Sequence, residues 1–355
     1  MKIGILGAGD MGGRVIRHLA NCSYVGAIVA YDIDPKRVEE MRTNHGIDAT
    51  NDLGKLLSDS SIGLVFVTAA NHAHKELTLH ALEAGKAVMC EKPMATTLAD
   101  AREMLDAAKR RNAFLQIGFE LRYSRLYTKV KEWIDLGLLG QVVNTHCEYV
   151  CSEFWGNKSW RSEGIGGGMF GEKLSHYVDL PRWWINSTVT DVFSVCAPNV
   201  VPYYRVRDNY HTTYRFANGA VSHITFSMAP AATFRGDPLQ NVVNQQRGDG
   251  HELRYFIQGT KGAAATDIYA RTIRRWAFGE LDGEFTSQLV ETLTWEGEED
   301  FTYFHNTKDQ ARDIVRRVAE GLPPASHAAD AYETMRLCFA AEESAETGGI
   351  VRLDD

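Results

Sequence analysis

The stretch MKIGILGAGDMGGRVIRHLA (1–20) decides the fold of the first part of the chain. A short apolar run at 2–6 predicts a buried strand, and the apolar spacing beyond the glycines predicts an amphipathic helix. Between them lies the pattern Gly7-x-Gly9-x-x-Gly12. Gly7 permits a tight turn, Gly9 lets backbone approach a pyrophosphate, and Gly12 lets helix and strand pack closely. This order predicts a phosphate-binding turn at a helix N-terminus.

A second predicted strand, YVGAIVAYD (24–32), ends in an acid, Asp32. It lies about 20 residues beyond Gly12, the spacing that the dinucleotide-binding fingerprint requires. Strand, glycine turn, helix, strand and acid therefore predict a nucleotide site. Asp10 and Met11 lie within the turn and are included in the predicted cofactor contacts.

The identity of the cofactor depends mainly on Asp32. Its carboxylate can accept hydrogen bonds from the adenosine ribose hydroxyls and would repel a 2′-phosphate, which favours NAD over NADP. Two alternatives remain: a solvated aspartate at a strand end, or a phosphate accommodated by Lys36 and Arg37 nearby.

Strands and helices continue to alternate up to residue 120. Apolar strands are predicted at 62–70, 87–90 and 113–119, with helices at 74–85 and 97–112 between them. Repeated units of this kind predict a parallel, doubly wound sheet and hence a Rossmann domain over residues 1–120. In such sheets, ligands bind beyond the carboxyl ends of the strands.

Two of these strand ends supply candidate site residues. Ala69 and Asn71 lie at the end of one strand, and Asn71 is expected to bond the nicotinamide ribose. The stretch AVMCEKPMAT (87–96) places Glu91 and Lys92 at the end of the next, where a proline prevents the strand from continuing. Both side chains are therefore expected to reach the bound cofactor, and Lys92 also the substrate.

Beyond residue 120 the alternation stops. A helix is predicted at 124–140 and a long strand at 141–154, and the sequences ANGA and TKGA have the chemistry of hairpin turns. Further strands are predicted at 190–198, 209–228, 251–268 and 271–279, followed by two closing helices and a short final strand. We therefore predict a second, α+β domain over residues 121–355, with a large, mostly antiparallel open sheet. This prediction allows the C-terminal helices to pack back on the first domain.

Composition excludes several classes of protein. The formal charge is −8 and 24% of residues are charged, which argues against nucleic acid or an anionic membrane as partner. No apolar stretch is long enough to span a bilayer, and the N-terminus does not resemble a secretory signal. The six cysteines form no CxxC pair, so a reduced, cytoplasmic setting without a zinc site is expected. His72, His74 and His80 have no accompanying carboxylate or cysteine, so no metal is predicted there.

Several segments together resemble the Gfo/Idh/MocA oxidoreductases, the family of glucose-fructose oxidoreductase and inositol dehydrogenase. The matching stretches are GILGAGDMG, TAANHAH, ALEAGKAVMCEKPMA, GFELRYSR, GLLGQV and GGGMFGEKLSHYVDLPRW. The resemblance implies an N-terminal Rossmann domain, a C-terminal domain with a large open sheet, and a nicotinamide cofactor. It also implies a sugar or cyclitol substrate and, through the exposed sheet face, a homodimer or homotetramer.

The stretch SEGIGGGMFGEKLSHYVDLPRWW carries the second half of the predicted chemistry. A helix is expected after the glycines, so that Glu172 and His176 become i,i+4 neighbours on one face and Asp179 lies beside His176. Lys173 points elsewhere unless the first turn is irregular. The alternative is a polar pair on a helix surface, but the glycine loop and Lys92 favour an active site.

Hydride transfer from an alcohol requires a base for the hydroxyl proton, and histidine is suited to this because its pKa lies near working pH. We assign His176 as that base, with Lys92 stabilising the reacting oxygen. Glu172 is expected to orient His176 or bind a neighbouring hydroxyl. The family usually has aspartate at this position, and Lys173 becomes a possible second amine in the site.

Other residues complete the predicted site. Trp160 and Arg161 match a family segment that reaches over the cofactor, the alternative being a core tryptophan and a salt-bridged arginine. Arg122 and Tyr123 are expected to bind substrate hydroxyls. The stretch FWGNKSW (154–160) mixes aromatic and amide side chains, which suits a polyol, and Asn157 is expected to bind substrate. His74 is expected to support its loop.

Three functions remain open at this point. The first is an NAD-dependent dehydrogenase of a sugar, glycoside or cyclitol secondary alcohol. The second is a glycosidase that oxidises its substrate transiently with tightly held NAD. The third is a non-catalytic NAD-binding regulator, against which the presence of both Lys92 and His176 argues.

Overall fold

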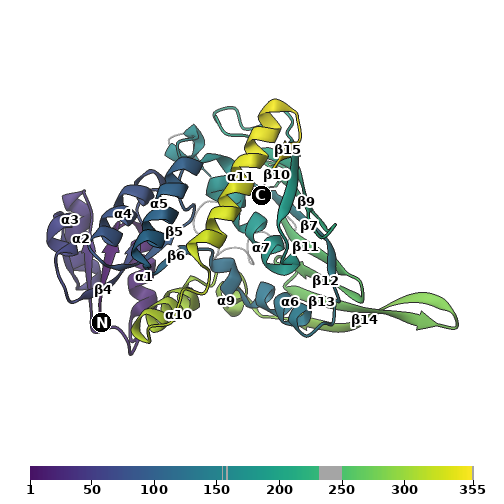
Figure 1. The fold of residues 1–355 in the computed structure, drawn as a ribbon, viewed down its shortest axis with the longest axis horizontal. Coiled ribbons are helices and arrows are strands. Elements are labelled where there is room, and N and C mark those ends of the chain that lie inside the picture. The colour runs from purple at the N-terminus through teal and green to yellow at the C-terminus, as the bar shows by residue number, and fades with distance from the viewer. Residues whose placement is uncertain (154, 157–158, 232–249, 354–355) are drawn as a thin grey trace. The chain divides into compact units, whose positions relative to one another are not determined.

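The computed structural model describes residues 1–153, 155–156, 159–231 and 250–353. Its contacts divide the chain into two compact units, coloured along the chain in Figure 1. The first unit comprises residues 1–120, 165–167 and 307–336, and the second comprises 121–164, 168–306 and 337–355. Neither unit is a single continuous stretch of chain.

The first unit is built on a parallel sheet in the order β3-β2-β1-β4-β5-β6. This is the strand order of the doubly wound dinucleotide-binding fold, in which two βαβαβ halves meet between β1 and β4. Its strands are β1 (Lys2–Leu6), β2 (Ala27–Tyr31), β3 (Asp48–Thr50), β4 (Ile62–Val67), β5 (Ala87–Glu91) and β6 (Leu115–Gly118). Its helices are α1 (Asp10–Leu19), α2 (Pro35–His45), α3 (Leu53–Leu57), α4 (His74–Glu83), α5 (Leu98–Arg111) and α10 (Thr307–Ala319).

Local sequence explains where these elements begin and end. Thr97 caps α5, because its side chain accepts a hydrogen bond from the backbone N–H of Asp100. The polypeptide leaves α4 through Gly85, which has a φ of +72°. The strands are buried on both faces, as their continuous apolar runs predict. The predicted fold class of this part is confirmed.

Helix α10 completes the core of the first unit although it lies late in the sequence. Ile314 and Val315 are fully buried in one cluster with Ile16 and Leu19 of α1. Arg312 also donates from Nε to the carbonyl oxygen of His18, 2.9 Å away. Both apolar packing and hydrogen bonding therefore attach residues 307–319 to the nucleotide-binding sheet.

The second unit contains a sheet in the order β14-β13-β12-β11-β7-β10-β9-β8-β15. All its described pairs are antiparallel except β10 with β7, which agrees with the predicted mostly antiparallel sheet. The strands are β7 (Val142–Cys151), β8 (Val189–Val195), β9 (Asn209–Phe216), β10 (Val221–Met228), β11 (Glu252–Gly259), β12 (Gly262–Asp267), β13 (Thr272–Leu281), β14 (Glu284–Thr294) and β15 (Val351–Arg352).

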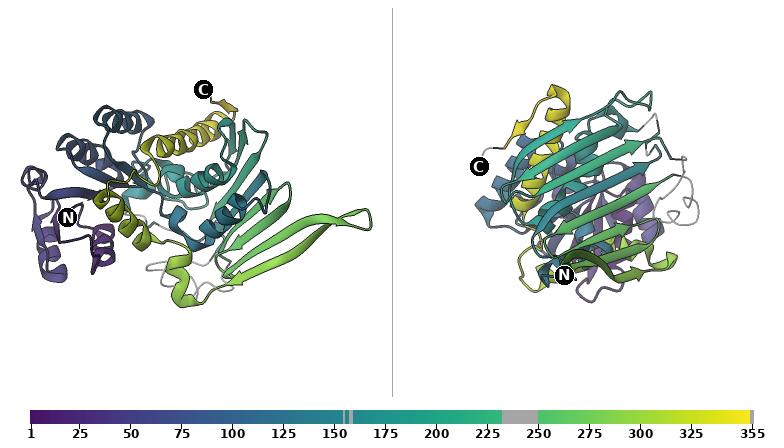
Figure 2. Two further views of the ribbon diagram at one scale, coloured as in Figure 1. Left: turned by 60° about the horizontal axis from the view of Figure 1, so that its bottom comes forward. Right: turned by 90° about the vertical axis from the view of Figure 1, so that its right-hand side faces the viewer.

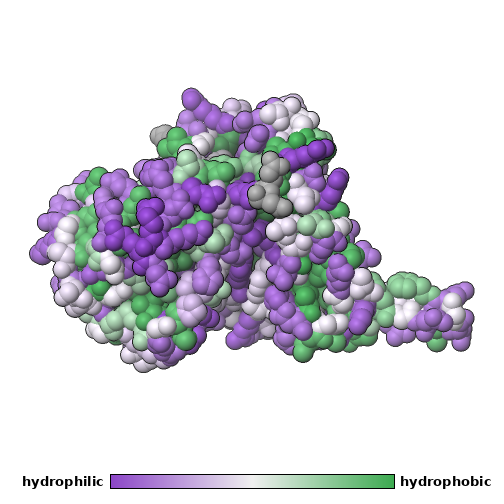
Figure 3. All heavy atoms as spheres, viewed as in Figure 1, coloured by the Kyte–Doolittle hydropathy of each residue, from purple (hydrophilic) through white to green (hydrophobic). Residues whose placement is uncertain are grey.

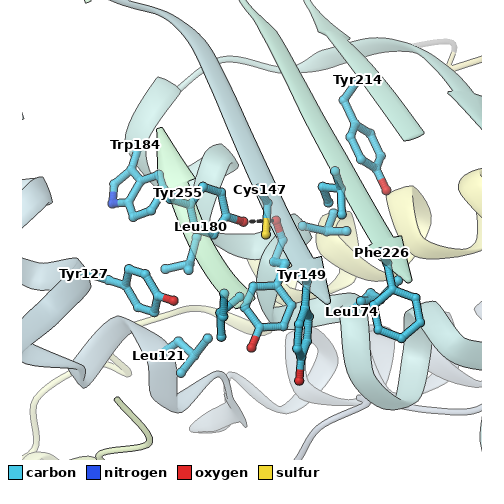
Figure 4. Close-up of a cluster of buried hydrophobic side chains, with 14 of the residues drawn as sticks. Leu121, Tyr127, Cys147, Tyr149, Leu174, Leu180, Trp184, Tyr214, Phe226 and Tyr255 are labelled. Atoms are coloured by element: carbon cyan, nitrogen blue, oxygen red, sulfur yellow. Dashed lines mark hydrogen bonds between the residues drawn. The ribbon is translucent and has the colours of Figure 1, made fainter. Parts of the chain in front are cut away.

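Helices cover one face of this sheet and leave the other open, as the two views in Figure 2 show. The covering helices are α6 (Arg125–Asp135), α7 (Ser175–Ile185), the short α9 (Asp300–Tyr303) and the second half of α11 (Ala328–Thr347). Beneath them, Tyr127, Trp184 and Tyr255 pack edge to face or tilted, with ring centroids 5.1 to 6.0 Å apart (Figure 4). The residues of β7 alternate accordingly between this core and the open face.

The hairpin β13–β14 extends beyond the rest of the second unit (Figures 1 and 2). Its second strand was not predicted, because the side chains of β14 are mostly exposed and show no alternation of burial. Hydrophobic and hydrophilic side chains mix on its surface in Figure 3, with Leu281, Phe285 and Leu289 among the exposed apolar ones. In the described parts of the chain, no helix combines the length and apolarity needed to cross a membrane.

Candidate cofactor and active site

The glycine loop of the first unit has the geometry that its sequence predicts. Gly7 adopts a φ of +111°, which only glycine tolerates readily, and a Cβ on Gly12 would overlap the carbonyl oxygen of Gly7. Thr68 at the end of β4 donates from Oγ1 to that carbonyl over 2.8 Å. Helix α1 begins at Asp10, immediately beyond Gly9, so its first backbone N–H groups lie in the loop.

Asp32 lies directly after β2 and is only 9% exposed. Its Oδ2 accepts a hydrogen bond from the backbone N–H of Ala8 (2.8 Å), and its Oδ1 accepts one from Asp34 (2.9 Å). The carboxylate thus ties the glycine loop to the end of β2 while staying at the edge where a ribose would lie. A Cβ on Gly9 would stand 2.8 Å from the guanidinium of Arg37, so this cation lies against the same loop.

His74 connects two of the predicted strand ends. Its Nδ1 lies 2.7 Å from the carbonyl oxygen of Pro93 and its Nε2 lies 3.1 Å from that of Ala69. The ring therefore bridges the segment after β5 and the segment after β4, the kind of support that the sequence predicted. Asn71 donates from Nδ2 to the carbonyl oxygen of Gly166, 3.0 Å away, and so anchors the first part of the glycine-rich segment to this unit. Its contact with the nicotinamide ribose stays a prediction.

Strand β5 delivers Glu91 and Lys92 to the carboxyl edge of the sheet, as predicted. Glu91 is paired in register with Gly118 of β6, and its carboxylate lies over that glycine, where a Cβ would approach Oε2 to 2.8 Å. Glu120, which sequence reasoning missed, follows two residues later and is also buried, with 5% exposure. Burial, reinforced by the like charge of Glu120 and opposed by Lys92, raises the pKa of Glu91 to about 8.

This raised pKa predicts an unusual dependence of stability on pH. Because the native state binds a proton that the unfolded state has released above pH 4.5, the group lowers the free energy of unfolding progressively between about pH 4.5 and 8. Replacing Glu91 with Gln removes this loss. The free energy of unfolding of Glu91→Gln minus that of the native chain should be larger by roughly 2 to 4 kcal/mol at pH 8 than at pH 5.

Urea unfolding at both pH values measures this difference. The exposed Glu83, on α4 of the same unit, provides the control, because its replacement by Gln should leave the pH dependence within about 0.5 kcal/mol of the native one. If the free energy of unfolding of Glu91→Gln changed with pH in the same way as that of the native chain, Glu91 would be ionised in the native state over this whole pH range.

A helix begins directly after the glycines, as predicted, but its first part is not regular α-helix. Residues Phe170–Leu174 form a π-helical turn, and α7 begins only at Ser175. A π-turn pairs residue i with i+5, so the α-helical i,i+4 relation between Glu172 and His176 does not apply. His176 is buried at the first turn of α7, and its ring centroid lies 6.1 Å from that of His305, a neighbour that no sequence pattern indicated. In a regular helix, Lys173 was expected to point away from Glu172 and His176. An irregular first turn, as found here, was the stated exception.

Glu172 binds an arginine of the same unit. Its Oε1 accepts a hydrogen bond from Nε of Arg161 over 2.7 Å, and this ion pair has a buried carboxylate and a half-exposed guanidinium. The guanidinium carbon of Arg161 lies 4.7 Å from the ring centroid of Trp160. Trp160, Arg161 and Glu172 thus form one connected group. The ammonium of Lys173 lies 5.9 Å from the ring centroid of Tyr149 on β7.

Arg122 and Asp179 form a buried, two-pronged ion pair with side chains 13% and 2% exposed. Nε and Nη2 of Arg122 donate to the two carboxylate oxygens over 2.6 and 2.7 Å. Asp179 was expected beside His176, but this pair connects α7 with the turn before α6. The backbone carbonyl of Tyr123 in that turn accepts a hydrogen bond from Asn306 (3.1 Å). The substrate contacts expected of Arg122 and Tyr123 stay predictions, as does that of Asn157, which lies outside the described residues.

Metal binding finds no support in the described parts of the chain, where no group of three or more His, Cys, Asp or Glu side chains could hold an ion. A hollow of about 540 Å³ in the first unit lies between the end of α5 and residues 321–329 and contains none of the predicted site residues. The polar groups described above therefore remain the candidate site.

The chain is similar to known oxidoreductases along its whole length. Residues 1–119 match the model of an oxidoreductase family with an NAD-binding Rossmann fold, and residues 127–265 match the Gfo/Idh/MocA C-terminal domain. The curated inositol 2-dehydrogenase 3 of Saccharopolyspora erythraea is 34% identical over 355 residues, covering 99% of this chain and 95% of its own. Inositol 2-dehydrogenase of Salmonella typhimurium is 28% identical over 354 residues, covering 98% and 95%.

Solved structures show the same fold. Levoglucosan dehydrogenase in complex with NADH and levoglucosan superposes with a TM-score of 0.80 at 22% identity, and each chain covers 100% of the other. The first family model confirms the predicted cofactor, NAD. That the glycine loop and Asp32 hold it stays a prediction. The chain therefore belongs to the Gfo/Idh/MocA family of NAD-binding oxidoreductases.

Proposed function

We propose that the protein is an NAD-dependent dehydrogenase of a secondary alcohol on a sugar, glycoside or cyclitol ring. The observation that carries this proposal is the position of Lys92, the first residue beyond β5. This residue follows the strand at the same edge of the parallel sheet as Asp32 and the glycine loop. That edge is where ligands of doubly wound sheets bind.

The roles of the residues follow from their chemistry. Lys92 donates a hydrogen bond to the reacting oxygen and stabilises the alkoxide character that develops on it. His176 accepts the hydroxyl proton, and the buried start of α7 holds its ring in place. Glu172 keeps the Arg161–Trp160 group beside the turn that carries His176. Bound NAD supplies the hydride acceptor.

The substrate class rests on the relatives and on the polar character of the site residues. The similar curated proteins include inositol 2-dehydrogenases and levoglucosan dehydrogenase, whose names specify a cyclitol and an anhydrosugar. A ring polyol presents several hydroxyls to side chains such as those of Arg161 and Glu172. We infer that this chain also takes a ring polyol.

A panel of inositols, aldoses and glycosides with NAD or NADP tests the proposal, with NADH absorbance and product release recorded together. Turnover-linked NADH with at least one ring polyol is the expected result, and it should be lost in His176→Asn. Glycoside cleavage without net NADH would assign a transient-oxidation glycosidase instead. Tight NAD binding without turnover of any compound would favour a regulator.

Asp32 should determine the preference for NAD. We expect Asp32→Ser to shift the ratio of kcat/KM for NADP over NAD by about tenfold or more, since it removes the charge that repels a 2′-phosphate and Arg37 is close to the loop. Steady-state kinetics with both cofactors measure the ratio. The exposed Asp48→Ser on β3 is the control, and an unchanged ratio in Asp32→Ser would contradict the assignment.

We further propose that the protein is a homodimer or homotetramer associated through the open face of its second sheet. Phe193 on β8 and Phe256 on β11 are exposed on strands whose neighbouring residues are buried. Exposed apolar side chains on an uncovered sheet face are typical of association surfaces. Sedimentation of the Phe193→Lys/Phe256→Lys variant should show a smaller species than the native chain, and an unchanged mass would contradict this surface.

A further inference from the structure

A carboxylate from the far end of the sequence lies at the start of the π-turn. Oε1 of Glu342, on α11, accepts a hydrogen bond from the backbone N–H of Phe170 over 3.0 Å. The backbone of Met169 contributes a second hydrogen bond to the same side chain. Glu342 and the π-turn belong to the same compact unit. The carboxylate therefore takes the place of an N-cap, because Met169 at the cap position makes no side-chain capping bond.

The other carboxylate oxygen is held as well. Oε2 of Glu342 accepts a hydrogen bond from the hydroxyl of Tyr210, a buried residue of β9. The ring of Tyr210 packs edge to face on that of Phe170, with centroids 4.8 Å apart. Glu342 is thus fixed between the sheet and the turn. Burial raises the pKa of Glu342 above its ordinary value, although the hydrogen bonds from Phe170 and Tyr210 oppose this shift.

Gly168 is fitted to this carboxylate. It has a φ of +73°, and a Cβ at this position would lie 2.5 Å from Oε1 of Glu342. Its neighbour Gly166 is anchored in the first unit by Asn71. The last glycine of the segment therefore serves a specific contact, in addition to the flexibility expected from the sequence.

We propose that Glu342 is a positioning residue that fixes the start of the π-turn and thereby the direction of Glu172 and His176. The proposal rests on the proposed function, in which His176 accepts the proton. A π-turn is a rare conformation, and an irregular turn keeps one direction only when its surroundings hold it. A displacement of a catalytic group by about 1 Å can lower the rate about a hundredfold, so the anchor bears directly on turnover.

The first experiment compares Glu342→Ala with Glu342→Gln and with the neighbouring, exposed Glu343→Ala as control. We expect kcat to fall about 30- to 100-fold in Glu342→Ala. The Kd for NAD should stay within about twofold, because the hydrogen-bond partners described for Glu342, which are Met169, Phe170 and Tyr210, are not among the predicted nucleotide contacts. The pKa seen in the kcat–pH profile should also shift. Gln retains the acceptor for Phe170 and should restore kcat to within about fivefold, and Glu343→Ala should match the native chain.

A double-mutant cycle tests the contact itself. Gly168→Ala should lower kcat by at least as much as Glu342→Ala, because the added methyl group displaces the carboxylate and alanine is also strained at this positive φ. The combined variant should lose less kcat than the product of the two single losses, since the methyl group then meets no carboxylate and only the backbone strain at residue 168 remains. Additive losses would overturn the proposal, because they would mean that Gly168 and Glu342 act independently.

Hydrogen exchange at the amides of Met169 and Phe170 gives a readout that does not depend on turnover. Exchange at these amides should accelerate in Glu342→Ala and to a lesser extent in Tyr210→Phe, while the amides of β5 stay unchanged. Native-like exchange and an unchanged kcat–pH profile in Glu342→Ala would overturn the inference. Full activity of His176→Asn would instead refute the proposed function, and exchange at the two amides would still decide whether Glu342 holds the turn.

Discussion

Replacing Lys92 with methionine is expected to lower kcat by at least about a hundredfold, while the Kd for NAD stays within about twofold of the native value. Methionine keeps an unbranched stem but lacks the ammonium, so the developing alkoxide of the proposed mechanism loses the cation that stabilises it. A single oxyanion donor is typically worth about 10² to 10³ in kcat, and here the donor also carries a charge. Single-turnover absorbance at saturating NAD measures the chemical step, and calorimetry measures NAD binding.

Lys55→Met is the matched control, because Lys55 is an exposed lysine on α3 of the same unit. It should leave both quantities unchanged. If Lys92→Met retained native turnover, the ammonium would have no part in the chemistry and the mechanism proposed here would be wrong. A parallel loss of NAD affinity would show that the contact with the cofactor expected of Lys92 also contributes to NAD binding.

The second large effect concerns the buried ion pair of Arg122 and Asp179. Arg122→Met leaves a carboxylate that is 2% exposed without its cation, which typically costs about 3 to 5 kcal/mol. The seven tryptophans all lie between residues 133 and 295, within the second unit, so their fluorescence in urea follows the unfolding of that unit. We expect the midpoint of this unfolding transition to move to a lower urea concentration, as a loss of about 3 to 5 kcal/mol in the free energy of unfolding requires.

The double variant Arg122→Met/Asp179→Leu separates two possible roles of Arg122. Replacement of a buried ion pair by apolar side chains is often close to neutral, so the double variant should recover most of the lost stability. If Arg122 acts only through this pair, KM should recover with it. A KM that stays high in the stable double variant would support the direct contact with substrate hydroxyls predicted from the sequence.

The first unit could be predicted in detail because its signals are local. The glycine spacing, the acid after β2 and the apolar runs of β4 and β5 each specify their own segment. The strand β14 could not be predicted from an alternation of apolar and polar residues, because its side chains are mostly exposed and it pairs along its length with β13 alone. The sequence Asp282-Gly283 between the two strands was the available signal, since it is a typical hairpin turn.

The candidate site was predictable only where a strand end or a motif indicated it. Lys92 and Asp32 were found in this way, whereas Glu120 and Glu342 were not. Glu342 contacts a backbone amide 172 residues earlier in the chain, and no local pattern encodes such a pair. The π-turn escaped prediction for a related reason. It differs from an α-helix in its hydrogen bonding and not in its composition.

The late position of α10 has a consequence for biosynthesis. Ile314 and Val315 fill the core beside α1, so the nucleotide-binding unit lacks part of its interior until residues 307–336 have been translated. A nascent chain of residues 1–306 would expose that apolar surface on the ribosome, where it is vulnerable to aggregation. We therefore expect NAD-binding competence to appear only after α10 has been translated, and a fragment ending before α10 to require a chaperone or the missing helix supplied as a peptide.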